Sequence, residues 1–462
     1  MAVTAPRALT DWTDRFFAVS ERGSTAGTEI RAGVTTFLAM AYIIFVNPAI
    51  LSNAIDFEGA FPQLLTVTCM AAAFGTLIMA LWANLPFALA PGMGLNAFFT
   101  FTVVFELGYA WQEALGAVFV SGILFLIISA TGLRAWILDS IPLALKHAIT
   151  AGIGAFLAII GFQNAGNGNG LTTDSPATLL TRGDWTDARL WLLGAGILVI
   201  GALLALRIKG ALVIGIVVIS AVAIITKADV FPGGEFQGFG DGVFGFTWPS
   251  DLIGALDIGA AFDVSGTFAA SLLSVVFTFL FVDFFDTAGT LIGLSEKADM
   301  LDEDGNIEAP RAAFTADGAA TAVGALLGTS STTTYIESAA GVEEGGKTGL
   351  ASLVTGLLFV AAMFLSPLAS AIPSLATAPV LIIIGAMMMT GAAKVDWEDY
   401  RISIPAFLTI VGMPFTYSIT DGISLGIISY AAISVLSGKG REVHPVMYVI
   451  AGLLLWRFFI VG

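Results

Sequence analysis

Apolar segments recur along the whole sequence, and this repetition constrains the fold more than any other feature. Most of them approach the roughly 20 residues that an α-helix needs to cross a lipid bilayer. Of the 462 residues, 57% are hydrophobic and only 12% are charged, whereas about a quarter of the residues in a soluble domain are charged. One water-soluble core cannot bury this much apolar surface. The sequence therefore predicts an all-α, multi-pass protein of the inner or plasma membrane.

Fourteen segments are candidate spans, and the charges between them indicate their orientation. The segments are residues 31–51, 65–84, 95–108, 112–132, 145–163, 189–206, 211–227, 268–294, 313–328, 335–345, 348–371, 378–394, 403–419 and 421–438. With a cytoplasmic N-terminus, Lys and Arg gather in the inner connections, as the positive-inside rule requires. Arg182 and Arg189 are the clear exceptions. A further apolar segment, 446–460, is either an extra span or an interfacial helix.

Composition argues against several other classes of protein. Cys69 is the only cysteine, and His147 and His444 are the only histidines, so we expect neither a disulfide framework nor a metal site or cofactor. The net charge of −16 argues against nucleic acid, which binds basic patches. The sequence has no nucleophile–base or metal motif typical of an enzyme, and no continuous polar stripes typical of a passive channel.

The third and tenth candidate spans are too short to cross a bilayer, and each follows a run of helix-breaking residues. The run 84–96 contains Pro and Gly, whereas the run 328–337 is rich in Ser and Thr. Backbone groups without partners are tolerated at membrane depth only where they line a cavity or are buried in protein. Paired interruptions seven spans apart therefore predict a transporter binding site between two inverted repeats. The alternative is a pair of ordinary loops that dip between helices.

Two acids, Asp283 and Asp286, lie inside the long apolar eighth span. Their i, i+3 spacing puts both on one face of a helix. Because a charge at the bilayer centre costs roughly 2.5–3.5 kcal/mol on insertion scales, we expect both to have a function. They either bind a substrate by hydrogen bonds or carry a proton. The structural alternative is that one of them only ties a neighbouring helix.

Two polar residues at the interrupted segments are further candidates. Glu337 follows the Thr-rich run, where it either contacts a ligand or satisfies the N-terminus of a helix. Asn96 can donate and accept at once, which suits the edge of a heterocycle. A hydrogen bond between helices is the equally good alternative for Asn96.

Four long stretches, spread over most of the chain, resemble one family of permeases. They are Gly33–Pro48, Ala90–Phe99, Phe281–Thr290 and Gly328–Gly341. On these residues the chain resembles the nucleobase–cation symporter-2 family of xanthine and uracil permeases, and within it the adenine–guanine–hypoxanthine branch.

The resemblance implies a fold of fourteen spans in two inverted seven-helix repeats, with short β-strands in spans 3 and 10. A core domain and a gate domain alternate along the chain, and the gate domain forms a homodimer contact. The implied division is 1–30 for a cytoplasmic N-terminal segment, 31–132 and 267–371 for the core, 133–266 and 372–438 for the gate, and 439–462 for a C-terminal segment.

The resemblance also implies a function, namely import of adenine, guanine or hypoxanthine by proton symport with elevator-like alternating access. The substrate contacts then fall on Asp283, Glu337 and Asn96, with Asp286, Gly94 and Thr334 in support. The proton would be carried by Asp283, Asp286 or Glu337. Transport of another nucleobase, xanthine or uracil, is an alternative. Transport of a small anion is another, although three central acids argue against it.

Overall fold

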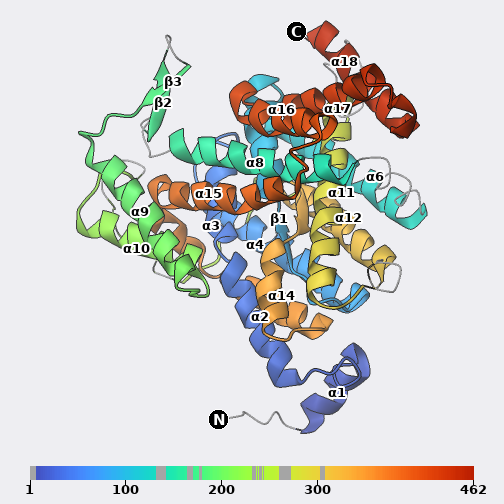
Figure 1. Cartoon of the computed structure of the whole chain (residues 1–462). Helices are drawn as coiled ribbons and strands as arrows, with labels where there is room; N and C mark the ends of the chain where they lie inside the picture. The colour runs from blue at the N-terminus through green and yellow to red at the C-terminus, as the bar shows by residue number, and fades with distance from the viewer. Residues whose placement is uncertain are drawn as a thin grey trace.

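The computed structural model describes residues 7–131, 142–163, 170–175, 179–231, 236, 238, 242, 244–259, 272–301, 307 and 309–461. It is mostly helical (Figure 1), and helices occupy the described residues of each of the fourteen predicted segments, in whole or in part. The expected domain boundaries at 132/133 and 266/267 lie outside these described residues. In the described part of the first half, the α-helices are α1 Arg7–Phe17, α2 Ala26–Met40, α3 Ile43–Leu51, α4 Ala60–Ile78, α5 Met93–Ala97, α6 Trp111–Thr131, α8 Leu143–Gln163, α9 Ala188–Ala205 and α10 Ala211–Ile225, with π-helices at Met79–Ala83 and Phe98–Glu106.

The second half is helical in the same way. Its helices are α11 Leu272–Lys297, α12 Pro310–Leu327, α13 Ala339–Glu343, α14 Gly349–Ala362, α15 Ser374–Met388, α16 Tyr400–Thr416, α17 Ile419–Leu436 and α18 Pro445–Val461. The described residues also contain four short strands, namely β1 Leu89–Pro91, β2 Thr172–Ser175, β3 Leu179–Arg182 and β4 Thr332–Thr334. β2 and β3 form a hairpin, whereas β1 pairs with β4 across most of the chain.

Eight helical stretches in the described residues are long and apolar enough to cross a membrane by themselves. They are Ala26–Leu51, Ala60–Ala83, Trp111–Thr131, Leu143–Gln163, Ala188–Ala205, Val275–Lys297, Ser374–Lys394 and Ile419–Leu436. Shorter apolar helices lie at Met93–Glu106, Ala211–Ile225, Gly349–Ala362 and Pro445–Trp456. The first of these is short because β1 interrupts the segment before it.

The helices pack in two groups. In one group, α12 packs against α4 and α6, and α14 packs against α2 and α4. In the other, α8 packs against α15 and α16, α16 packs against α17, and α9 and α10 pack against α15. Small residues permit this close packing, as they do in membrane proteins generally. A Cβ atom on Gly122 of α6 would lie 2.7 Å from the backbone nitrogen of Ala322 in α12.

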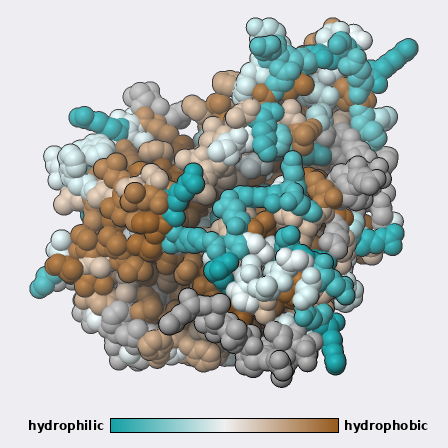
Figure 2. All heavy atoms as spheres, turned by 60° about the horizontal axis from the view of Figure 1, so that its bottom comes forward, coloured by the Kyte–Doolittle hydropathy of each residue, from teal (hydrophilic) through white to brown (hydrophobic). Residues whose placement is uncertain are grey.

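The outer surface carries apolar side chains where a soluble protein would carry charges. Figure 2 shows a broad brown, hydrophobic area on one side of the molecule, beside a face rich in teal, hydrophilic residues. On α9 and α10, Leu198 and Ile225 are 75% and 79% exposed. Patches of this kind are rare on soluble monomers, so lipid is their natural solvent.

Candidate functional site

The two interrupted segments meet inside the molecule as a two-stranded antiparallel sheet. β1 and β4 pair in the register Leu89–Thr334, Ala90–Thr333 and Pro91–Thr332, and β1 lies near the centre of the bundle in Figure 1. The pairing continues beyond both strands. The Gly92 N–H donates to the carbonyl of Ser331 at 2.8 Å, and the Tyr335 N–H donates to the carbonyl of Ala88 at 2.9 Å.

Each outer edge of this small sheet is bonded by a threonine of a neighbouring helix. On the β1 side, Thr76 of α4 accepts from the Leu89 N–H at 2.9 Å and donates to the Leu89 carbonyl at 3.0 Å. On the β4 side, Thr321 of α12 lies 3.3 Å from the nitrogen and 3.0 Å from the carbonyl oxygen of Thr332. Backbone groups at a sheet edge seldom remain unpaired in a membrane interior, and these two hydroxyls lie within hydrogen-bond distance of them.

Asp283 lies on α11 beside the β4 edge of the sheet. Its side chain is 1% exposed, and its Oδ2 atom accepts a hydrogen bond from Thr321 at 2.9 Å. Among the described residues its other oxygen, Oδ1, has no hydrogen-bond partner. A buried carboxylate oxygen with a free lone pair is an acceptor for a ligand N–H group.

Asp317, on α12, is a buried acid that our sequence analysis did not single out. It accepts three hydrogen bonds, from the Thr287 hydroxyl at 2.8 Å, the Thr334 N–H at 2.9 Å and the Thr334 hydroxyl at 2.8 Å. Asp317 and Thr321 are one helical turn apart, so α12 presents both to the same edge of β4. The signal in the sequence is a lone acid within the Ala- and Gly-rich segment Pro310–Leu327.

Glu337 follows β4 and is tied to the first half of the chain. Its Oε1 accepts from the Tyr42 hydroxyl at 2.5 Å, a contact that spans 295 residues of sequence. Asp286, one turn beyond Asp283 on α11, interacts electrostatically with Glu337. Both acids are partly exposed rather than fully buried, and they lie at the end of the strand pair.

Asn96 forms the hydrogen bond between helices that was the alternative to ligand contact. Its amide donates to Asn47 Oδ1 of α3 at 2.6 Å, and Asn47 in turn donates to Thr68 at 2.7 Å and to Thr329 at 3.0 Å. The Asn47 amide nitrogen donates to two threonines, so the Asn47 oxygen is the atom that accepts from Asn96. The Asn96 oxygen is buried and without a partner within the part of the chain that the structure describes.

Gly94 and Thr334 are the remaining predicted site residues. Gly94 permits close helix packing, and Thr334 belongs to strand β4. A Cβ atom on Gly94 would lie 2.5 Å from Ile153 of α8, so only glycine lets α5 approach α8 this closely. Thr334 donates hydrogen bonds to Asp317 from both its hydroxyl and its N–H. The structure thus brings Asp283 and Thr334 to one edge of the sheet, Asp286 and Glu337 to its end, and Asn96 to a separate polar cluster.

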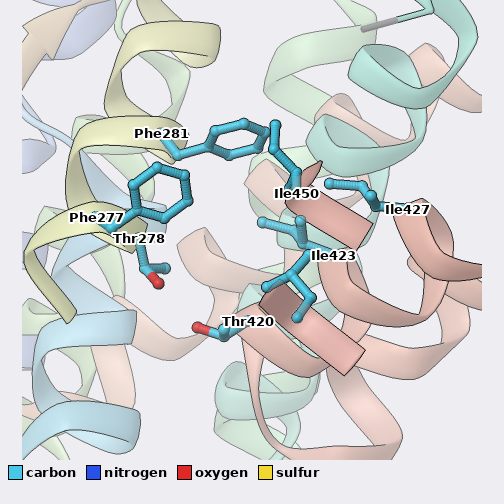
Figure 3. A pocket seen from close by; sticks show the side chains of 8 residues that line it. Phe277, Thr278, Phe281, Thr420, Ile423, Ile427 and Ile450 are labelled. Carbon is cyan, nitrogen blue, oxygen red and sulfur yellow. The ribbon is translucent and has the colours of Figure 1, made fainter. Parts of the chain in front are cut away.

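One pocket lies away from these residues, between α11 and the pair α17–α18 (Figure 3). Its walls are mainly apolar, with Phe277 and Phe281 on one side and Ile423, Ile427 and Ile450 opposite. Phe281 is two positions from Asp283, which puts the two side chains on different faces of α11. Of the residues that the structure describes, no group of three or more His, Cys, Asp or Glu side chains could hold a metal ion.

Apolar helices around two interrupted segments, with acids buried beside them, define a multi-pass membrane transporter. The family model of the xanthine/uracil permeases, described as a permease family, matches residues 27–425. The chain therefore belongs to the xanthine/uracil permease family, and its relatives there are transporters rather than enzymes.

Two relatives and one solved structure illustrate the similarity. The adenine permease AdeP of Escherichia coli is 40% identical, and the match covers 96% of this chain and 95% of the relative. The guanine/hypoxanthine permease PbuG of Bacillus subtilis is 41% identical, over 94% of this chain and 96% of the relative. The transmembrane domain of the cyanobacterial bicarbonate transporter BicA has a TM-score of 0.61 at 14% identity, over 86% of this chain and 96% of that domain. Identity this low shows a common fold only.

Proposed function

We propose that this protein imports purine nucleobases (adenine, guanine or hypoxanthine) by symport with protons. The observation that carries the proposal is near-full-length similarity to an adenine permease and to a guanine/hypoxanthine permease, at 40% and 41% identity. The chemistry of the central acids supports it, because a purine edge presents N–H donors and carboxylate oxygens accept them.

We propose that all fourteen segments cross the membrane as two inverted repeats of seven. The pairing of β1 with β4 supports this arrangement, since one strand comes from each half of the chain. The edge contacts support it further. Thr76 bonds the N–H and carbonyl of Leu89 in β1, and Thr321 bonds the same two groups of Thr332 in β4. Two halves related by an internal twofold axis would produce this correspondence.

The proposed domains follow the two packing groups. The core comprises 31–132 and 267–371, and the gate comprises 133–266 and 372–438. In support, α12 packs within the first group and α8 within the second. We further propose that the N-terminus lies in the cytoplasm and that two copies pair through their gate domains.

In the proposed site, Glu337, Asp286 and Asp283 accept hydrogen bonds from the base. Glu337 and Asp286 are partly exposed, and the free Oδ1 of Asp283 supplies a further acceptor. Asn96, Gly94 and Thr334 support the site by fixing α5 and β4 beside it. Sites that hydrogen-bond a polar group of their substrate strongly reject analogues that lack it.

The proposed mechanism moves the core against the gate and carries the base across the membrane with it. A proton loaded on one of the acids on the outer side would leave on the inner side. An acid deep in an apolar environment suits this role, because burial favours its neutral form. The proton and the base would then cross together in one rigid movement, as in other transporters with inverted repeats.

Uptake into vesicles tests this function directly. We expect labelled hypoxanthine to accumulate in vesicles that contain the protein when the outside is more acidic than the inside, and unlabelled adenine or guanine to compete. Collapse of the pH gradient should abolish the accumulation. Competition by xanthine, uracil or bicarbonate instead would support the alternative substrates, and uptake indifferent to every purine would refute the proposal.

Cross-linking tests the movement of core against gate. Lys209, between α9 and α10, forms a salt bridge with Glu344, which follows α13. The bridge therefore marks a contact between the proposed gate and core.

We expect a Lys209→Cys/Glu344→Cys variant, in a Cys69→Ala background, to lose nearly all uptake after treatment with a short cleavable bis-maleimide. Reductive cleavage should restore it. The matched control is Arg31→Cys/Glu344→Cys, because Arg31 contacts Glu344 at 3.0 Å and both lie in the proposed core. Cross-linking the control should leave uptake unchanged. Normal uptake by the first cross-linked pair would contradict the elevator-like mechanism.

A further inference from the structure

The hydroxyl of Thr321 stands between a carboxylate and the backbone of β4. It is fully buried on α12, and its oxygen lies 2.9 Å from Asp283 Oδ2 and 3.0 Å from the carbonyl oxygen of Thr332. The Thr332 N–H approaches the same oxygen at 3.3 Å. Two acceptors, Asp283 Oδ2 and the Thr332 carbonyl, therefore compete for the one hydrogen of the hydroxyl.

A hydroxyl has one hydrogen to donate and two lone pairs to accept with. When Asp283 is ionised, both of its oxygens are acceptors only, so Thr321 donates to Oδ2. A charge-assisted bond of this kind is stronger than a bond to a neutral carbonyl. The Thr332 carbonyl is then left without the Thr321 hydrogen.

The register of the sheet explains why that carbonyl depends on Thr321. The pairs Gly92–Ser331 and Ala88–Tyr335 are hydrogen-bonded, and bonded and non-bonded pairs alternate along an antiparallel ladder. Pro91–Thr332 is therefore a non-bonded pair, and the backbone groups of Thr332 point away from β1 toward α12. Their partner there is the Thr321 hydroxyl.

Protonation of Asp283 reverses the direction of the bond. A proton on Oδ1 would be a buried donor without an acceptor in the described part of the chain, where Oδ1 has no partner. A proton on Oδ2 instead donates to the Thr321 oxygen, which can still accept from the Thr332 N–H. The hydroxyl hydrogen of Thr321 must then turn, and the Thr332 carbonyl is the acceptor within reach.

We propose that Thr321 is a positioning residue that transmits the protonation state of Asp283 to strand β4. The inference rests on the proposed proton symport. One proton binds Asp283, the hydroxyl hydrogen of Thr321 rotates without leaving its oxygen, and β4 gains one hydrogen bond to α12. Strand β4 is thereby held more firmly on α12 when Asp283 is protonated than when it is ionised.

Other ionisable groups surround this relay but do not replace it. From α11 and α12, Asp286 and Asp317 act on Asp283 electrostatically, and Glu337 and Tyr335 follow β4. From α8, Lys146 lies 5.5 Å from the ring of Phe285. Asp317 contacts the same strand but already accepts three hydrogen bonds from Thr287 and Thr334. Thr321 is the described side chain that the structure bonds to both Asp283 and β4.

Thr76 provides a matched control from within the same sheet. It bonds the N–H and carbonyl of Leu89 in β1 as Thr321 bonds those of Thr332, and its printed partners are these backbone groups rather than a carboxylate. Both threonines are fully buried. Thr76→Val and Thr321→Val therefore remove equivalent edge bonds, and only the second removes the link to an acid.

The test is the pH dependence of hypoxanthine affinity, measured by calorimetry on the purified full chain. Binding linked to uptake of one proton changes affinity by up to about tenfold per pH unit. The slope of hypoxanthine affinity against pH distinguishes the variants. We expect the wild type and Thr76→Val to show the full slope, Thr321→Val to lose at least half of it, and Thr321→Ser to recover it. Thermal unfolding of each variant reports the purely structural effect, which we expect to be at least as large for Thr321→Val as for Thr76→Val, because only Thr321→Val also loses the bond to Asp283.

Two results would overturn the relay while leaving proton symport intact. One is a wild-type slope in Thr321→Val, and the other is an equal loss of slope in Thr76→Val, which would mean that edge bonding alone is responsible. A flat profile in the wild type itself would instead refute the proton coupling of the proposed function, and the relay with it.

Discussion

Replacing Asp283 with Asn or Glu337 with Gln is expected to weaken hypoxanthine binding by about 10- to 100-fold each, and to abolish it in combination. A hydrogen bond to a charged group contributes about 1.5–3 kcal/mol, and 1.4 kcal/mol corresponds to a factor of ten in affinity. The amides have almost the same size as the acids, so the loss of affinity reports charge and acceptor capacity rather than packing. Equilibrium binding of labelled hypoxanthine to purified protein measures the effect.

The control is an acid of the same kind outside the proposed site. Glu113 accepts from the Ala110 N–H at the start of α6, at an exposed position, and Glu113→Gln should bind hypoxanthine as the wild type does. Membrane levels of all variants are compared, so that loss of protein is not mistaken for loss of binding. Wild-type affinity in both Asp283→Asn and Glu337→Gln would show that the base binds elsewhere.

The second large effect is expected at Asp317. Asp317→Ala leaves three donors without their acceptor, namely the Thr287 hydroxyl and the N–H and hydroxyl of Thr334. An unsatisfied buried polar group costs about 1–3 kcal/mol. Because hydroxyls can turn to other partners and a backbone N–H cannot, we expect a loss of about 3 kcal/mol in stability and no uptake. Thermal unfolding in detergent and vesicle uptake measure the two effects.

A graded series separates the role of Asp317 from a general loss of packing. Asp317→Asn keeps one acceptor oxygen and should retain part of the stability, whereas Thr334→Val removes one hydroxyl and leaves the N–H of Thr334 paired with Asp317. We therefore expect the order of stability to be wild type, Thr334→Val, Asp317→Asn and Asp317→Ala. An unfolding temperature and uptake rate equal to the wild type in Asp317→Ala would contradict the anchoring role.

Much of the fold was predictable because the apolar segments are local features. The predicted boundaries follow the helices closely, for example 112–132 against Trp111–Thr131 and 421–438 against Ile419–Leu436. The two breaker-rich runs were also visible in the sequence, because Pro, Gly and Thr interrupt helices by their own chemistry. Their function as a site remains a prediction.

The partners of the site residues were not predictable, because each belongs to a distant part of the chain. Tyr42 meets Glu337 across 295 residues, and Asn47 meets Thr329 across 282. Asp317 was missed for another reason. It lies among alanines and glycines rather than among large apolar residues, so its burial does not stand out by periodicity, although its tight packing follows from those small neighbours.

The pairing of β1 with β4 has a consequence for how the protein is made. The hydroxyl of Tyr335 bonds the carbonyl of Pro91 over 244 residues, and long-range contacts of this kind form late. As the chain emerges from the ribosome, β1 is translated long before its partner β4. Until β4 has been made, the edge of β1 that faces it has no strand partner, and a chain that stops before residue 332 lacks the strand that completes the pair.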